Sequence, residues 1–176
     1  MLSREDAFYF ENLLTLGFFY EYNEWLDSCL ETEDPLSNVA LELSWCGSDY
    51  VKTISLLNSY RKEKQIDEAS VCDRWRLFLK KAYHSGQMDK GQVVSAMYKI
   101  ASHIGDPGDF DSDVWGYMFY LDEYYSLAED GILGWEKFDS EFLEYLDHGS
   151  TIGFDKIWGS GKRATLIDRI KVFSKR

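Results

Sequence analysis

The chain has 176 residues, of which 45% are hydrophobic and 16% aromatic, and its formal net charge is −12. Such a chain is long enough to bury one core of ordinary size and too apolar to be intrinsically disordered. Because so acidic a chain repels phosphate groups, the composition argues against nucleic acid and anionic membranes as partners. A basic protein partner, a cation, or solubility alone remains as the explanation of the charge.

Apolar residues recur at spacings of three and four along most of the chain, and this period predicts an all-α fold. Only Pro35 and Pro107 interrupt the pattern. We find no residue-level repeat at a fixed period, which argues against a solenoid. The sequence therefore predicts an irregular multi-helix bundle of helical hairpins with a C-terminal basic helix.

Two helices are expected in the first thirty-odd residues. Ser3 is typical of a helix N-cap, so the first helix is predicted to run from there to Leu16. After Gly17, an apolar stripe at steps of three and four predicts a second helix from Phe18 to Leu30.

A third helix is predicted to start at Asp34 and Pro35. Aspartate is a good N-cap, and proline suits the first helical position because its missing N–H has no partner there. Gly47 is expected to end this helix, and a fourth follows up to the polar run 61–68. The inward-facing residues of these two helices are predicted to be Leu36, Val39, Ala40, Leu43, Val51, Ile54 and Leu57, with Trp45 and Tyr60 at the margin.

The second half of the chain predicts four more helices. Two of them, over 68–86 and 89–105, carry apolar residues at every third or fourth position and end at a glycine. The other two are expected within 114–131 and, shorter, within 132–149.

The C-terminal part differs in composition from the rest. Residues 149–161 hold four glycines and two serines, and residues 156–176 hold seven Lys or Arg and one Asp. The apolar side of this basic segment is formed by Leu166, Ile170 and Phe173. We therefore predict an acidic helical domain over 1–148, followed by a Gly-rich connection and a basic amphipathic helix over 149–176 that docks on the same domain.

Cysteine usage and hydropathy indicate a cytoplasmic location. Cys29, Cys46 and Cys72 are odd in number and show no CxxC spacing, which predicts free thiols in a reducing compartment. The N-terminus has acidic residues where a secretory signal needs basic ones, and no apolar run approaches the roughly 18 residues of a membrane span.

An acidic loop precedes the aromatic-rich helix within 114–131. The loop resembles a calcium loop in its alternating carboxylates, which are those of Asp106, Asp109, Asp111 and Asp113. In an EF-hand that begins at Asp109, however, Val114 would replace the required Gly and Tyr120 the bidentate Glu. We therefore predict no metal site, and expect these acids to cap the helix and to face solvent.

The helix that follows the loop has more aromatic residues than one inward stripe accommodates. Three tyrosines are expected on or near a second, solvent-facing side, although packing against neighbouring helices is an equally plausible explanation for them. Exposed tyrosines beside carboxylates suit recognition of a basic partner. The predicted partner-binding residues are Asp109, Asp111, Asp113, Tyr117, Tyr120, Glu123 and Tyr124.

Within this helix the run Asp122-Glu123-Tyr124-Tyr125 resembles the acidic, Tyr-Tyr recognition surface of the colicin-type nuclease immunity proteins. The resemblance covers four residues, and Ser126 stands where that family has a proline. It implies a small acidic helical protein that neutralises a basic toxin domain. We therefore predict a non-enzymatic protein-binding module of the toxin-immunity kind.

Two other functions remain open. A carboxylate-based metal-dependent enzyme would bring Asp106 and Asp109 together with Glu42 or Asp49, but the Glu-x-x-His pairs typical of such bundles do not occur. A nucleic-acid adaptor would act through the basic tail. Because no catalytic spacing surrounds any histidine, cysteine or serine, we predict neither catalytic residues nor a cofactor.

Overall fold

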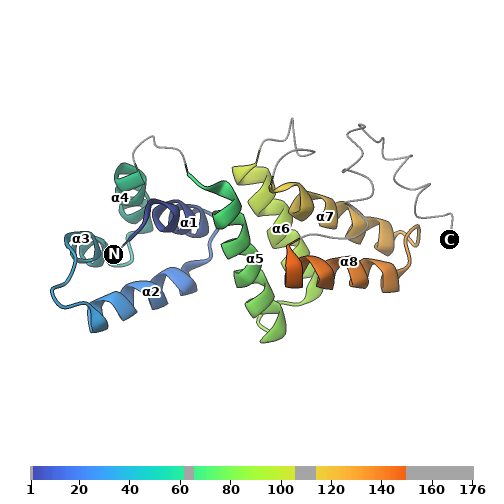
Figure 1. Cartoon of the computed structure of the whole chain (residues 1–176), viewed down its shortest axis with the longest axis horizontal. Helices are drawn as coiled ribbons and strands as arrows, with labels where there is room; N and C mark the ends of the chain where they lie inside the picture. The colour runs from blue at the N-terminus through green and yellow to red at the C-terminus, as the bar shows by residue number, and fades with distance from the viewer. Residues whose placement is uncertain (1, 62–65, 106–113, 150–176) are drawn as a thin grey trace. The chain divides into compact units, whose positions relative to one another are not determined.

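The computed structural model describes residues 2–61, 66–105 and 114–149, and all regular secondary structure in these ranges is α-helical (Figure 1). The prediction of an all-α fold is thereby confirmed. The helices are α1 (Arg4–Thr15), α2 (Phe19–Thr32), α3 (Asn38–Cys46), α4 (Tyr50–Arg61), α5 (Glu68–His84), α6 (Lys90–Ile104), α7 (Gly116–Glu129) and α8 (Trp135–His148).

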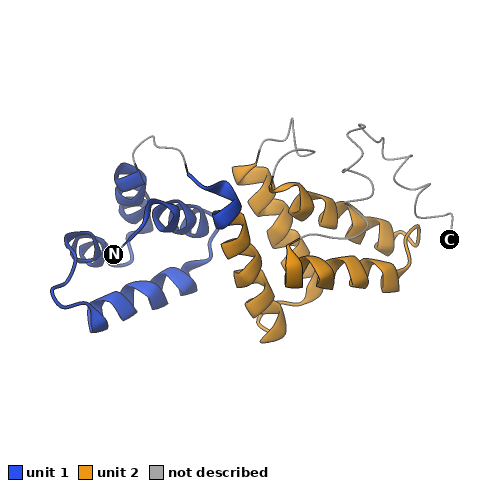
Figure 2. Cartoon of the chain, in the orientation of Figure 1, with its two compact units in different colours: residues 1–71 blue, residues 72–176 orange. Residues whose placement is uncertain are grey.

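The chain divides into two compact units, residues 1–71 (unit 1) and 72–176 (unit 2) (Figure 2). Helices α1 to α4 belong to unit 1 and α6 to α8 to unit 2, while most of α5 lies in unit 2. This division falls inside the stretch 1–148 that the sequence predicted to be one acidic domain. The predicted basic helix within 149–176 lies outside the described residues apart from Gly149.

Unit 1 is organised around α1, which packs along α4 and against α2. The Phe10 ring lies 5.6 Å from the ring of Tyr22 and 4.7 Å from that of Trp25. The predicted cap at Ser3 is present, because its hydroxyl accepts from Asp6 N–H while the Asp6 carboxylate accepts from Ser3 N–H. Aromatic burial between α1 and α2 and the α1–α4 contact thus form the core of this unit.

The predicted start of the third helix is wrong. The Asp34–Pro35 peptide bond is cis, and α3 begins at Asn38 with Ser37 as its N-cap. The Ser37 hydroxyl accepts a hydrogen bond from Ala40 N–H at 3.3 Å, and the Glu33 carboxylate accepts one from Ser37 N–H at 3.2 Å. Serine is as good an N-cap as aspartate, so the sequence offers two possible helix starts within four residues. The hydrogen bonds around Ser37 favour the later start.

Unit 2 packs α7 between α6 and α8, and α5 lies against α8 through a perpendicular contact of the Tyr83 and Phe142 rings at 5.2 Å. Its largest fully buried side chains are Trp75, Trp115, Tyr124, Phe138, Phe142 and Tyr145. Helix α8 ends at Gly149, whose φ of 78° lies in the left-handed region that glycine adopts without strain. Of the two helix endings predicted from glycine in this unit, the one at Gly105 is present, and Gly86 lies two residues beyond His84, the last residue of α5.

The capping box of α6 generates a test of this fold. The Asp89 carboxylate accepts from Gln92 N–H and the Gln92 side chain accepts from Asp89 N–H, both at 2.8 Å. Asp89→Ala is expected to lower the free energy of unfolding by about 1 kcal/mol, because the Gln92 backbone N–H loses its side-chain acceptor. Urea denaturation followed by circular dichroism measures the change. Ser95→Ala, an exposed substitution in the same helix, serves as the control, and an equal loss for both variants would contradict the capping role.

Candidate interaction surface

The structure does not place the predicted tyrosine surface on the outside of α7. Tyr120 and Tyr124 are buried, with 6% and 2% of their surface exposed, while Tyr117 and Glu123 are half-buried. The prediction that these tyrosines face solvent is therefore wrong for Tyr120 and Tyr124. Because α7 packs against both α6 and α8, it buries two sides rather than one stripe. Asp109, Asp111 and Asp113 lie outside the described residues.

The run that carries the immunity-protein resemblance also packs inward. Tyr124 is in the core, and the Tyr125 ring lies 5.4 Å from the rings of both Trp135 and Phe138. Burial, with a smaller contribution from the negative charge of Glu129, raises the pKa of the Asp122 carboxyl. These residues therefore join α7 to α8, and they do not present two exposed tyrosines to a partner.

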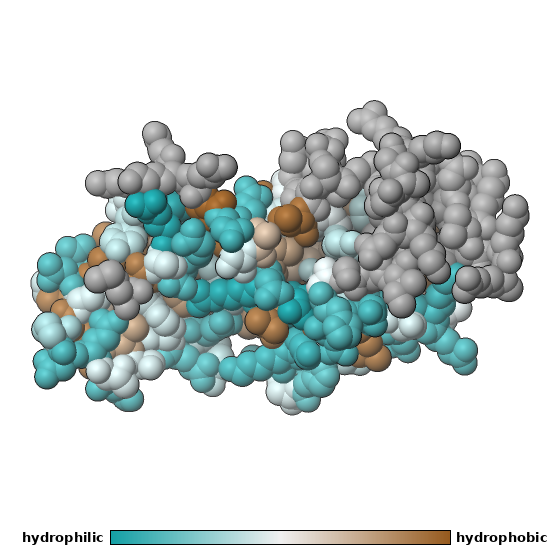
Figure 3. Space-filling model, in the orientation of Figure 1, coloured by the Kyte–Doolittle hydropathy of each residue, from teal (hydrophilic) through white to brown (hydrophobic). Residues whose placement is uncertain are grey.

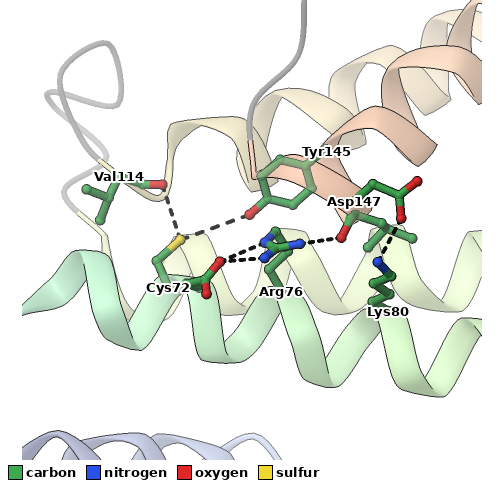
Figure 4. Close-up of polar contacts among 8 residues, drawn as sticks. Cys72, Arg76, Lys80, Val114, Tyr145 and Asp147 are labelled. Carbon is green, nitrogen blue, oxygen red and sulfur yellow. Dashed lines mark hydrogen bonds and ion pairs between the residues drawn. The ribbon is translucent and has the colours of Figure 1, made fainter.

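A buried polar network in unit 2 is centred on Arg76 (Figure 4). Its Nε and Nη2 atoms donate to Asp73 Oδ1 at 2.8 and 2.6 Å, and Nη1 donates to the carbonyl oxygen of Leu146 near the end of α8. A β-carbon at Gly149 would lie 3.4 Å from Arg76 Nε, so a glycine at this position leaves room for the guanidinium. Arg76 thus serves as a cationic cap for the C-terminus of α8.

The same network includes a thiol and a phenol. Cys72 Sγ donates to the carbonyl oxygen of Val114 at 3.3 Å and lies 4.0 Å from the Tyr145 hydroxyl. Burial, followed by the electrostatic and hydrogen-bonding effects of the neighbouring Cys72 sulfur, raises the pKa of Tyr145 well above its usual value. Because each of these groups has a partner within the fold, the network is best explained as a tie between α5, the start of α7, and α8.

The most exposed aromatic and aliphatic residues of unit 1 lie where three helix ends meet, at the start of α2, the end of α3 and the start of α4. Trp45 is 74% exposed, Val51 79% and Tyr20 60%. The Phe19 ring stacks on the Tyr50 ring at 4.3 Å, which joins α2 to α4. We call these five residues, Phe19, Tyr20, Trp45, Tyr50 and Val51, the corner surface. On the face drawn in Figure 3, apolar patches likewise interrupt a mostly polar surface.

Further contacts hold the corner surface in place. The Asn23 side chain donates to the Tyr50 hydroxyl at 3.2 Å. Tyr22, buried beneath, has a pKa raised by burial and lies near Cys46 and Tyr50. The ends of α2, α3 and α4 are therefore fixed against one another, and the corner surface is a built part of unit 1.

Negative charge surrounds the corner surface. Residues 5–51 contain eleven Asp or Glu and no Lys, Arg or His. Glu24 accepts a hydrogen bond from the Tyr20 hydroxyl at 2.6 Å, and Glu42 is exposed one helical turn before Trp45. The pKa of Asp49 is lowered by its hydrogen bond and ion pair with Lys52, so this carboxylate is charged at neutral pH. Apart from Lys52, which pairs with Asp49, the charged residues from 5 to 52 are all acidic, and exposed aromatic side chains in a mostly negative field are the chemistry that a basic partner fits.

The corner surface was not predicted from the sequence, because Trp45 and Val51 were expected to face the core. Val51 fits the three-residue steps of an apolar stripe and Trp45 lies just beyond the end of another, but the residues that α3 and α4 bury are Ala40, Leu43, Thr53 and Leu57. Thr53 is buried because its hydroxyl donates to the Asp49 carbonyl oxygen, which satisfies it within the helix. The signal that could have located the surface was the absence of any basic residue from 5 to 51.

Within the described residues, no group of three or more His, Cys, Asp or Glu side chains is placed to hold a metal ion, and none of the helices has the length and apolar character of a membrane span. All three cysteines are free thiols. Asp106 and Asp109, the loop acids of the metal-enzyme hypothesis, lie outside the described residues.

Comparisons with protein-family models, with curated proteins and with solved structures give no match.

The Arg76 cap predicts unequal effects of two neighbouring substitutions. Arg76→Met leaves the Leu146 carbonyl oxygen buried without its donor, and it is expected to lower the free energy of unfolding by about 2–3 kcal/mol. Lys80→Met removes the Lys80–Asp147 ion pair, whose side chains are largely in water, and should leave stability nearly unchanged. Chemical denaturation of both variants measures the two changes in the free energy of unfolding. Similar losses of stability would show that Arg76 acts only as a surface charge.

The raised pKa of Tyr145 predicts that the stability of the fold depends on pH in the alkaline range. Because its pKa is raised in the folded state, the unfolded chain loses this proton first, at about pH 10. The stabilising contribution is therefore intact below about pH 10, and stability falls above it by up to about 1.4 kcal/mol per pH unit for one such group. Tyr145→Phe should make that fall shallower. Tyr98→Phe, at an exposed tyrosine, should keep the wild-type slope, and equal slopes for all three proteins would contradict the argument.

Proposed function

We propose that this chain is a non-enzymatic binding module that captures a basic protein domain on the corner surface of unit 1. The observation that carries the proposal is the Trp45 side chain, three-quarters exposed at the end of α3 within a stretch of eleven acids and no bases. Single exposed apolar residues are common on proteins and require no explanation. Here five aromatic or aliphatic residues lie at the start of α2, the end of α3 and the start of α4, where acids far outnumber bases and Phe19 stacks on Tyr50.

The two features of the surface have separate physical roles. Tryptophan and tyrosine dominate the energetics of protein interfaces, because they bury a large area while losing little side-chain entropy. The surrounding carboxylates steer a cationic partner and raise its association rate, with little effect on how long the complex persists. We therefore expect Trp45 and Tyr20 to determine the affinity for the partner. Acids such as Glu24 and Glu42 should determine the association rate.

Within this function class we propose the toxin-immunity role, in which the module neutralises a basic toxin domain. Its support is the acidic helical character of the chain together with an aromatic anchor in an anionic field. The contact residues that we propose lie on the corner surface instead of on α7, because Tyr120 and Tyr124 are in the core of unit 2. A basic protein encoded by a neighbouring gene is the partner to seek first.

A charge-reversal pair tests the surface. The full chain is titrated with a fluorescein-labelled cationic lysine–leucine peptide, and association and dissociation rates are measured at several salt concentrations. Glu24→Lys with Glu42→Lys should slow association about tenfold at low salt, because the steering field at the corner surface is reduced. Glu129→Lys with Asp130→Lys changes the net charge equally at exposed sites in unit 2 and should leave the rate within about twofold.

The aromatic anchor is tested separately in the same titration. Trp45→Ala should speed dissociation about tenfold, which corresponds to about 1.4 kcal/mol, and leave association unchanged. Ile132→Ala, at an exposed residue of unit 2, is the matched control. Equal effects of the two charge pairs, or no effect of Trp45→Ala, would overturn the assignment of the corner surface.

A further inference from the structure

In unit 1, helix α1 holds a cation between an aromatic ring and a carboxylate that are one helical turn apart. Phe8 and Glu11 are separated by three residues. The guanidinium carbon of Arg61 lies 4.9 Å from the centroid of the Phe8 ring, and Arg61 Nε lies 3.6 Å from Glu11 Oε2. A ring face attracts a cation electrostatically, and the carboxylate adds an ion pair. The guanidinium of Arg61 therefore has two kinds of partner on one helix.

Helix α8 has the same arrangement in unit 2, with a lysine as the cation. Lys90 Nζ lies 5.5 Å from the centroid of the Trp135 ring and forms an ion pair with Asp139, four residues further along the helix. Residues three or four apart on a helix are neighbours on its surface, so a ring and a carboxylate at this spacing can contact one cation together. The arrangement thus occurs once in each unit, on helices of different sequence.

Helix α3 carries the same combination of side chains on its exposed face. Glu42 precedes Trp45 by three residues and Leu41 precedes it by four, so the three side chains share one face of the helix. All three are exposed. The carboxylate comes before the ring here and after it on α1 and α8, but the spacing of about one turn is the same. We call Glu42 and Trp45 the α3 pair.

The described part of unit 1 supplies no cation to the α3 pair. Lys52, the first basic residue after it in the sequence, lies 3.0 Å from the Asp49 carboxylate and is therefore already paired. Among the described residues, neither the Glu42 carboxylate nor the Trp45 ring has a cationic partner. The α3 pair thus offers a partner protein the chemistry that α1 and α8 use within the chain.

We propose that the α3 pair binds an arginine side chain of the basic partner, with the guanidinium stacked on the Trp45 ring and hydrogen-bonded to the Glu42 carboxylate. This proposal rests on the proposed function, since it names the residue by which the partner is recognised at the corner surface. A guanidinium is planar and more weakly hydrated than an ammonium group, and it can stack on a ring while it donates two hydrogen bonds to one carboxylate. At an exposed site these properties favour arginine over lysine.

The first test compares two cationic peptides on the full chain. One is the lysine–leucine peptide, and the other has the same sequence with every lysine replaced by arginine. The arginine peptide should bind the wild-type protein about fivefold more tightly. In Glu42→Gln, and in Trp45→Leu, which keeps an apolar side chain without a ring, the two affinities should agree within about twofold. Glu31→Gln removes an exposed carboxylate elsewhere in unit 1 and should keep the fivefold preference.

The second test uses single amino acids, so its result does not depend on a protein partner. N-acetylarginine amide and N-acetyllysine amide carry the same single positive charge. Each is titrated into isotope-labelled full-length protein while NMR follows the indole N–H signal of Trp45, which the Trp45→Phe variant identifies among six tryptophans. The arginine amide should shift this signal several-fold more than the lysine amide at equal concentration. Glu42→Gln should remove most of that difference.

The two tests separate the arginine site from the proposed function. Equal binding of the two peptides to the wild-type protein, while Trp45→Ala still speeds dissociation, would overturn the arginine assignment and leave the capture of a basic domain intact. A Trp45 signal that neither amide shifts would also overturn it. If the arginine amide shifts the signal in a Glu42-dependent way but substitutions at the corner surface change the binding of neither peptide, the α3 pair binds arginine as proposed and the function of capturing a basic domain fails.

Discussion

Aromatic burial is the constraint on which both units depend. A tyrosine brings a large apolar area into a core, but its hydroxyl then needs a partner there. Tyr9 donates to the Glu21 carboxylate at 2.8 Å, and the Tyr145 hydroxyl meets Cys72 Sγ. Each of these contacts joins two helices, so the polar end of the ring fixes which helix faces which. A chain with twelve tyrosines can therefore specify its helix packing through hydroxyl partners as well as through ring shape.

The same constraint explains how much of the fold was predictable. Helix α6 was placed from sequence because a capping box, a regular stripe and a terminal glycine all agree on it. The start of α3 was misplaced because Asp34–Pro35 and Ser37 are competing start signals of similar strength. A period of 3.6 residues states which side chains share a face of a helix, but whether another helix covers that face depends on the tertiary arrangement. Trp45 and Tyr124 were assigned to the wrong environments for this reason.

The site that we propose has the kind of chemistry expected from the sequence, but it lies at a different place. Composition and charge were enough to favour an acidic, aromatic surface and a basic partner. Two facts about the packing were needed to locate the site. Helix α7 buries two of its sides, so Tyr120 and Tyr124 are not on the surface, and most of the Trp45 side chain is left uncovered by the described residues. Sequence spacing carries no information on either point. The one local signal was the stretch from 5 to 51 without a basic residue. It indicates an excess of negative charge but does not show which side chains are exposed to it.

The excess of negative charge in unit 1 also has a consequence for stability. Two ion pairs, Lys52–Asp49 and Arg61–Glu11, offset part of this charge, but the remaining like charges repel one another in the folded state and lower its stability. A cation bound at the corner surface relieves this repulsion in the folded state more than in the expanded unfolded chain, so binding and folding of unit 1 are thermodynamically linked. The repulsion that weakens the free unit is thus the same interaction that draws a basic partner to it. An acidic surface with few internal cations is in this sense poised to be completed by a partner.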